Sequence, residues 1–184
     1  MSQKRSVCVF CASSNDVDPV YFRGAQELGK GLAERGHTLV YGGGNIGLMG
    51  EVATATHKHG GIVVGVIPEA LKNRERAYMK ADELVVTTGM RERKAEMDAR
   101  SEMFVVLPGG FGTLEEAIEA LTARFLGYHD KPLVFININR FYDPLLELFE
   151  HFFSEQFAQP DQRLVYTVVD SVSEFFLRLD EARF

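Results

Sequence analysis

Several features that would assign this chain to a membrane, secreted or nucleic-acid-binding class are absent from its sequence. No stretch approaches the roughly 20 apolar residues that a membrane-spanning helix requires, so we expect no membrane partner. The apolar run that follows Lys4 and Arg5 ends near Cys11 and is too short for a signal peptide, which predicts a cytoplasmic protein. Basic residues are not in excess, since the formal net charge is -6 and the sequence pI is about 5.4. This balance argues against a nucleic-acid partner but leaves room for a small anionic ligand.

Cysteine is scarce, and the spacing of a metal site is missing. The two cysteines, Cys8 and Cys11, form a C-x-x-C within a β-branched, apolar run. Residues three apart in a strand point to opposite faces of the sheet, so the two sulfurs cannot reach each other or a shared metal. His57 and His59 are two residues apart at a helix end and do not share a face. We therefore predict two buried cysteines and no metal site.

The residues that are present suit one compact domain from residue 1 to residue 184, since 46% of them are hydrophobic. Strand-like runs alternate with helical patterns, and the runs lie at residues 7–10, 38–41, 62–67, 84–86, 104–107, 133–136 and 164–168. These runs are nearly continuous in Val, Ile, Leu and Phe, which is typical of parallel strands buried on both faces. The sequence therefore predicts an α/β protein with a Rossmann-like three-layer fold, a mostly parallel sheet with helices on both faces.

Ligands of such sheets bind where strands end and helices begin, and three of these loops are unusual: residues 11–15, 41–50 and 108–116. In the second loop, Gly42, Gly44 and Gly47 have the spacing G-x-G-x-x-G of a dinucleotide site. The match is weak, because this loop follows the second predicted strand and no acidic residue cleanly ends the next one. We interpret the loop as a tight turn that approaches a phosphate or ribose. Its substrate-binding candidates are Gly43 and Gly44, together with Ser13 of the first loop.

The loop at residues 108–116 is more specific. Gly109, Gly110 and Gly112 let the backbone pass close to a ligand, and Thr113 is expected to open a helix. The predicted apolar face of this helix contains Leu114, Ala117, Ile118, Leu121 and Phe125. Free amides at a helix N-terminus attract phosphate, and the missing G-K-[ST] ending argues against nucleoside triphosphate hydrolysis. The alternative, that Thr113 and Glu116 are only a capping box, leaves the three glycines unexplained.

The segment 90–100 has the pattern of a helix with two cations on its inward face, which contains Met90, Arg93, Lys94 and Met97. A buried cation needs an anion beside it. That anion is either a carboxylate, Glu115 or Glu116, or a bound ligand. The predicted phosphate-binding loop belongs to the same end of the sheet, which favours the ligand.

Two of these segments together resemble the signatures of one family. M-x-x-R-K at residues 90–94 and P-G-G-x-G-T-x-E-E at residues 108–116 are similar to motifs of the Lonely Guy (LOG) family, the cytokinin riboside 5'-monophosphate phosphoribohydrolases. The resemblance covers nearly the whole chain, including residues 9–14, 41–50, 66–68 and 126–132. It implies a homodimer without metal or organic cofactor that hydrolyses the N-glycosidic bond of a nucleoside 5'-monophosphate to free base and ribose 5-phosphate. Relatives have also carried the label lysine decarboxylase, but no segment resembles a pyridoxal-phosphate site.

The resemblance also implies roles for individual residues. Breaking an N-ribosidic bond develops positive charge on the sugar, so a carboxylate is needed beside the ribose and a proton or cation near the leaving base. Glu116, with Glu115 as the alternative, is the predicted carboxylate, and Arg93 is the predicted catalytic cation. The implied substrate-binding residues are Glu75, Met90, Lys94, Gly109, Gly110, Phe111, Gly112, Thr113, Leu114, Glu115 and Thr122. Phe111 replaces the tyrosine common in plant members, which leaves the base preference open.

Two other functions are compatible with these patterns. One is an AMP or nucleotide nucleosidase without a hormone role. The other is a non-catalytic protein of the same fold that binds a nucleotide or the molybdenum cofactor, because fold alone does not separate carriers from enzymes.

The apolar residues predict an assembly as well. Met90, Met97 and Met103 flank the cationic helix, and the following helix offers Ala123 and Leu126 beyond its own core face. An excess of apolar positions on an acidic domain is typical of a partner surface, so we expect a homodimer with its contact near the active site. The alternative is that these methionines are ordinary core residues.

Overall fold

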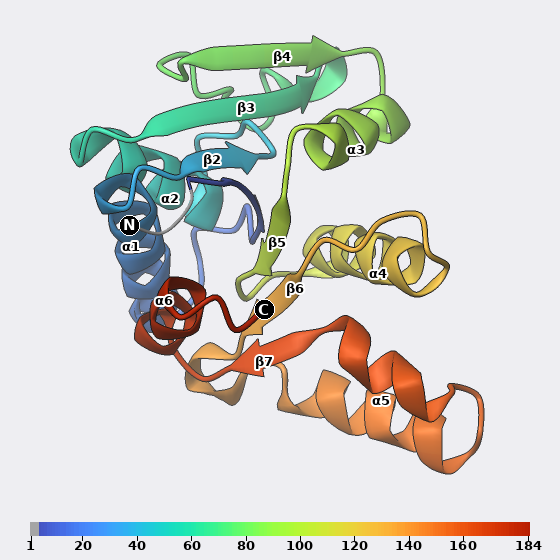
Figure 1. Cartoon of the computed structure of the whole chain (residues 1–184). Coiled ribbons are helices and arrows are strands. Elements are labelled where there is room, and N and C mark those ends of the chain that lie inside the picture. The colour runs from blue at the N-terminus through green and yellow to red at the C-terminus, as the bar shows by residue number, and fades with distance from the viewer. Residues whose placement is uncertain (1–3) are drawn as a thin grey trace.

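The computed structural model describes residues 4–184, so the first three residues of the N-terminal segment considered above lie outside it. Seven parallel strands form one sheet in the order β4-β3-β2-β1-β5-β6-β7 (Figure 1). The strands are β1 (Ser6–Phe10), β2 (Thr38–Tyr41), β3 (Ile62–Pro68), β4 (Glu83–Thr87), β5 (Met103–Val106), β6 (Leu133–Ile136) and β7 (Thr167–Val169). The α-helices are α1 (Pro19–Glu34), α2 (Gly47–Lys58), α3 (Met90–Ala99), α4 (Phe111–Phe125), α5 (Asp143–Ser154) and α6 (Val172–Asp180).

Helices cover both faces of the sheet, which confirms the predicted Rossmann-like three-layer fold. One core lies between the sheet and α1, α2 and α6, and the other lies between the sheet and α3, α4 and α5 (Figure 1). Cys8 belongs to the second core and Cys11 to the first, and both thiols are free and buried. The prediction that the two sulfurs face opposite sides of the sheet is therefore confirmed.

The last strand begins later than predicted. Leu164 and Val165 belong to the 3-10 helix η3 (Pro160–Val165), and β7 starts only at Thr167. Pro160 stands in the first turn of η3, and Gln159 and Gln162 form a reciprocal capping box there. The capping box and Pro160 fix the start of this helical turn, which continues to Val165 and so replaces the first part of the expected strand.

The winding of the chain reverses between β1 and β5. β1 pairs with β2 on one side and with β5 on the other, so the loops that follow β1 and β5 diverge to opposite faces. In parallel α/β sheets a crevice opens at such a point, outside the carboxyl ends of the strands. Ala12 donates its amide to the Pro108 carbonyl at 3.3 Å, which joins the two loops beside this crevice. No helix within residues 4–184 is long and apolar enough to cross a membrane.

Candidate active site

A pocket of about 310 Å³ lies at this crevice. Nine of the predicted site residues line it: Ser13, Glu75, Met90, Arg93, Gly110, Phe111, Gly112, Thr113 and Glu116. They come from the loop after β1, the segment after β3, the first turn of α3 and the loop and first turns of α4. The fold thus brings together residues that are up to about a hundred positions apart in the sequence, at the place where parallel sheets bind ligands.

The N-terminus of α4 opens into this pocket. The helix begins at Phe111 with Gly110 as its N-cap residue, two positions earlier than predicted, and none of the described side chains caps it. Thr113 is therefore the third residue of the helix, and the capping-box interpretation of Thr113 and Glu116 is wrong. The reason is the extended backbone of Gly110 (φ -90°, ψ -153°), which lets its carbonyl accept the first helical bond, from Leu114.

Three amides of this helix N-terminus, those of residues 111–113, have no acceptor in the part of the chain that the structure describes. A side chain at Gly110 or Gly112 would extend into open space, with no heavy atom within 4 Å. Packing therefore does not require glycine at these two positions, whereas an anion bound against the backbone does. The free amides and the helix dipole together form a site suited to a phosphate group.

The other glycines accommodate neighbouring parts of the site. A methyl group at Gly109 would lie 2.1 Å from Thr113 Oγ1, and one at Gly42 would lie 1.9 Å from Arg93 Nη2. A methyl group at Gly44 would lie 2.8 Å from Met49 Cε and 3.4 Å from Glu75 Cβ. Gly43 and Gly44 therefore do not line the pocket; Gly43 packs against Val66 and Ile67, and Gly44 packs against Met49 and Glu75.

The N-terminus of α2 is less suited to bind a phosphate than the N-terminus of α4. Gly47 has a left-handed φ of 57°, and its amide donates to Asn15 Oδ1 at 2.9 Å. A side chain at Gly47 would collide with the backbone of residues 13 and 14. Because the chain itself occupies this helix N-terminus, the G-x-G-x-x-G spacing is explained by loop packing and not by a dinucleotide site.

Arg93 is buried and crosses the carboxyl ends of two strands. Its Nε donates to the Val66 carbonyl at 3.2 Å and its Nη2 to the Gly42 carbonyl at 3.1 Å. Nη1 lies 3.8 Å from Glu116 Oε1, which is an ion pair without a direct hydrogen bond. The backbone carbonyls fix the guanidinium plane, and Nη1, which faces Glu116, also donates to Met90 Sδ at 3.6 Å.

Glu116 has an unusual proton affinity. Its side chain is only 10% exposed. Burial raises the pKa of Glu116 to about 7, with Arg93 opposing the rise and the nearby Glu115 and Glu75 carboxylates adding to it. A carboxyl group that titrates near neutral pH in a cleft, with a fixed cation beside it, is typical of an acid–base catalyst.

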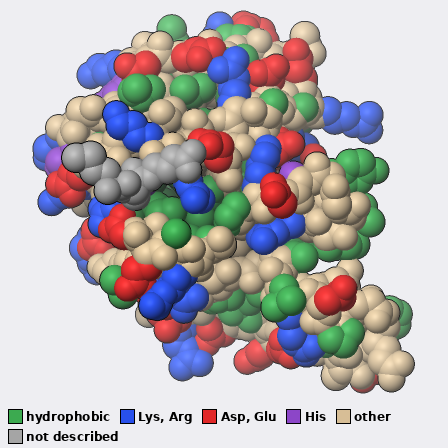
Figure 2. All heavy atoms as spheres, in the orientation of Figure 1, with side chains coloured by type: hydrophobic (Ala, Val, Ile, Leu, Met, Phe, Trp, Pro, Cys, Tyr) green, Lys and Arg blue, Asp and Glu red, His purple; other side chains and the backbone are tan. Residues whose placement is uncertain are grey.

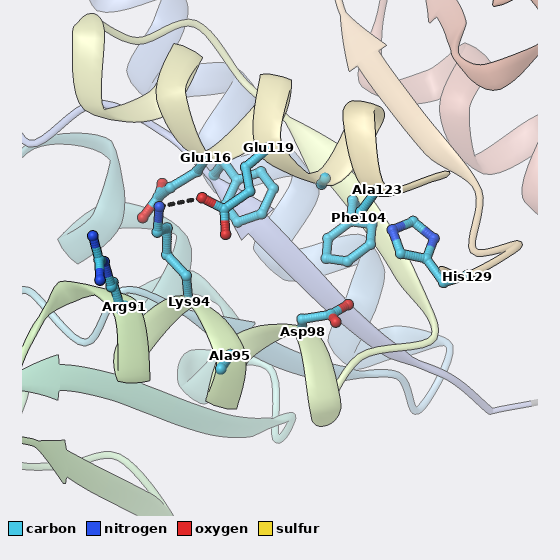
Figure 3. Close-up of a pocket in the computed structure, with 11 residues that line it drawn as sticks. Arg91, Lys94, Ala95, Asp98, Phe104, Glu116, Glu119, Ala123 and His129 are labelled. Atoms are coloured by element: carbon cyan, nitrogen blue, oxygen red, sulfur yellow. Dashed lines mark hydrogen bonds and ion pairs between the residues drawn. The ribbon is translucent and has the colours of Figure 1, made fainter. Parts of the chain in front are cut away.

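Lys94 and Glu115, also predicted site residues, lie beside this pocket rather than in it. Lys94 Nζ forms ion pairs with Glu115 and Glu119 in a groove of about 250 Å³ between α3 and α4, and the pair with Glu119 is visible in Figure 3. The two carboxylates raise the pKa of Lys94. Glu116 borders both the groove and the pocket. Of the two cations that the sequence placed on the inward face of α3, only Arg93 therefore lines the pocket.

Leu114 is partly buried on α4 and lines neither cavity. Thr122 lies further along the helix, in a shallow depression that also contains Leu126 and Tyr128.

Five residues of the pocket were not among the candidates: Cys11, Ala12, Ser14, Met49 and Leu71. Four of them lie within two of the three loops that the sequence marked as unusual, so the loops were predicted as part of the site although these residue types gave no signal of their own. Burial raises the pKa of the Cys11 thiol far above its usual range, so this cysteine is a wall of the pocket and not a nucleophile.

Comparison with known proteins decides the family. A family model described as "Possible lysine decarboxylase" matches residues 49–179. The cytokinin riboside 5'-monophosphate phosphoribohydrolase LOG of Oryza sativa subsp. japonica is 44% identical over 180 residues, which cover 98% of this chain and 74% of the relative. The chain belongs to the LOG family. A second member, a cytokinin riboside 5'-monophosphate phosphoribohydrolase of Arabidopsis thaliana, is 40% identical over 97% of this chain and 78% of its own length.

Solved structures show that this LOG protein shares its fold with other proteins. A molybdenum cofactor binding protein of Rippkaea orientalis superposes with a TM-score of 0.72 at 19% identity, over 100% of both chains. The molybdenum cofactor carrier protein of Chlamydomonas reinhardtii gives 0.70 at 22% identity, over 97% of this chain and 98% of that one. At these identities the likeness concerns the fold alone.

The lysine decarboxylase description does not fit the pocket. Pyridoxal phosphate enzymes hold their cofactor through a lysine Schiff base. No lysine is among the described residues that line the pocket, and the nearby Lys94 is paired with two carboxylates in the adjacent groove. The residues of this LOG protein therefore do not suit that cofactor.

Proposed function

We propose that this LOG protein hydrolyses the N-glycosidic bond of nucleoside 5'-monophosphates. Water adds to C1' of the ribose and the base leaves with a proton, so the products are free base and ribose 5-phosphate. The observation that carries the proposal is the placement of Glu116 and Arg93 in one pocket with the open N-terminus of α4. The names of the relatives support the same reaction.

The pocket suggests how the substrate lies. The 5'-phosphate accepts hydrogen bonds from the amides of residues 111–113. One carboxylate oxygen of Glu75, Oε2, is buried and has no hydrogen-bond partner among residues 4–184. A ribose hydroxyl can donate to it, which would satisfy the oxygen and orient the sugar. Phosphate binding at a distance from the reacting bond then holds C1' beside Glu116.

Glu116 provides the chemistry at the sugar. In its ionised form it stabilises the positive charge that develops on the ribose and accepts a proton from the attacking water. Arg93 favours this ionised form and offers N–H groups to negative charge in the pocket. Glu115 is half exposed and paired with Lys94, so Glu116 is the better candidate for the catalytic carboxylate.

The test is incubation of the purified protein with AMP and with N6-isopentenyl-AMP, followed by chromatography of the free base. Release of base together with an equal amount of ribose 5-phosphate supports the proposal, and the ratio of the two rates gives the base preference. Binding of both nucleotides without any release of base would instead make the protein a nucleotide carrier. Release of base from AMP but not from N6-isopentenyl-AMP would make it an AMP nucleosidase.

We further propose that the protein is a homodimer in contact through α4. Met97 and Met103 do not support this, because both are core residues with almost no exposed surface. Met90 is 43% exposed, and further exposed apolar residues lie at the end of α4: Leu126 is 60% exposed and Tyr128 is 81% exposed, and Phe125, expected in the core, is also exposed. Figure 2 shows hydrophobic side chains gathered where α4 ends and the chain turns toward β6. An exposed apolar patch of this kind is typical of a subunit contact.

A further inference from the structure

Glu75 is held over the pocket by a segment without regular structure. Residues 72–82, which we call the Glu75 strap, connect the 3-10 helix η1 (Glu69–Leu71) to β4. The Glu75 carbonyl accepts from the Asn45 amide at 3.0 Å, and the Tyr78 amide donates to the Gly43 carbonyl at 2.9 Å. Between these two bonds Arg76 adopts a left-handed backbone with φ of 49°. A non-glycine residue keeps this conformation only when its surroundings hold it there.

A hydrogen-bonded chain of side chains fastens the strap below Glu75. Tyr78 is buried in the core, and its hydroxyl lies 2.9 Å from His57 Nδ1. The other ring nitrogen, Nε2, lies 2.8 Å from Asp82 Oδ2. The Val63 amide also donates to Asp82 Oδ2, at 2.8 Å, and these two contacts hold the pKa of Asp82 below its usual range.

The two ring nitrogens of His57 link Tyr78 to Asp82. When Nε2 carries the ring proton, the Tyr78 hydroxyl donates to Nδ1 and Nε2–H donates to the Asp82 carboxylate. The chain then ties two residues of the strap to the last turn of α2 and to the start of β3. None of the three side chains lines the pocket. They act on the pocket only through the backbone that carries Glu75.

We propose that Tyr78, His57 and Asp82 are positioning residues that hold the Glu75 carboxylate in the nucleotide pocket. This inference rests on the proposed function, in which Glu75 orients the ribose. Without the Tyr78 hydroxyl, the backbone turn at Arg76 keeps its two hydrogen bonds to Gly43 and Asn45. It loses the hydrogen bond from Tyr78 to His57 that fastens the residues after the turn. Glu75 then occupies the productive position for a smaller fraction of the time, and the sugar is oriented less well.

A double-mutant cycle on AMP hydrolysis tests the proposal. Tyr78→Phe removes the hydroxyl and keeps the buried ring, and we expect it to lower kcat/KM by about tenfold. In a Glu75→Ala background the same change should alter kcat/KM by less than about twofold, because the group being positioned is gone. A full tenfold loss in both backgrounds would show that Tyr78 acts independently of Glu75 and would overturn the proposal.

Tyr41→Phe is the matched control. Tyr41 is fully buried in the same core, and its hydroxyl has no hydrogen-bond partner in the described residues. We expect wild-type kinetics from this variant. Equal losses from Tyr41→Phe and Tyr78→Phe would indicate general loosening of the core and would count against the strap.

Hydrogen exchange separates this inference from the proposed function, because it needs no turnover. In Tyr78→Phe the amides of residues 72–82 should exchange at least about tenfold faster than in the wild type, while those of the sheet are unchanged. Unchanged exchange in the strap would refute the positioning role even if the enzyme is active. Faster exchange in the strap of a protein that releases no base from any nucleotide would refute the proposed function alone.

Discussion

Replacing Glu116 by glutamine should make the protein more stable at alkaline pH and much less active. The pKa of Glu116 is raised to about 7 in the folded protein from an ordinary value of 4.5. The folded state therefore binds the proton more tightly than the unfolded state, and its stability falls as the pH rises between these two values. At about 1.4 kcal/mol per pKa unit, ionisation of Glu116 costs the folded state about 3 kcal/mol at pH 8.

Glutamine keeps the shape of the side chain but cannot ionise. Below about pH 4.5 the two proteins should be equally stable, since glutamate is then neutral in both states. Above about pH 7 the variant should be more stable by the full amount, which in a chain of this length corresponds to a Tm higher by about 5 to 10 °C. Because the sugar cation loses its stabilising carboxylate, kcat/KM for AMP should fall by about 10²- to 10⁴-fold.

Thermal unfolding of both proteins between about pH 4.5 and pH 8.5 measures the first effect, and release of adenine measures the second. Glu115→Gln is the control, because that side chain is half exposed and paired with Lys94. Parallel curves of Tm against pH for the wild type and Glu116→Gln would refute the raised pKa. A Glu116→Gln enzyme with wild-type turnover would refute the catalytic assignment, whatever the stability.

Three further predictions concern the ligand and the assembly. The 5'-phosphate should be required: kcat/KM for AMP should exceed that for adenosine by at least about 100-fold, and equal values would remove the phosphate assignment of residues 111–113. Gly112→Ala should leave the Tm unchanged or slightly raised, since its methyl group meets no atom within 4 Å, but should raise the KM for AMP by about tenfold. An unaltered KM would mean that no ligand approaches that backbone. Light scattering at micromolar concentration should give at least twice the 20.6 kDa chain mass, and Leu126→Glu should lower it. A wild-type monomer with full activity would contradict a shared site.

Local patterns in the sequence were sufficient to predict the architecture of the fold. Runs of β-branched and apolar residues alternate with helical segments, and strands of that composition are stable only when both faces are covered. The opposite orientation of Cys8 and Cys11 follows from the two-residue period of a strand and holds in the structure. The same reasoning placed the functional loops at the carboxyl ends of the strands. All of these inferences depend on residues close together in the chain.

Only the tertiary structure showed which of the candidate residues line the pocket and which lie outside it. Arg93 and Lys94 are adjacent in sequence and point about 100° apart around α3, so Arg93 lines the pocket while Lys94 pairs with Glu115 and Glu119 in the adjacent groove. Gly42 is a glycine because Arg93, 51 residues later, passes against it, and Glu75 lines the pocket from a strap whose Tyr78 and Asp82 contact α2 and β3. Each of these positions depends on the rotation of a helix or on a contact between distant residues. No local period encodes such contacts, because they arise only when the sheet and its helices pack together.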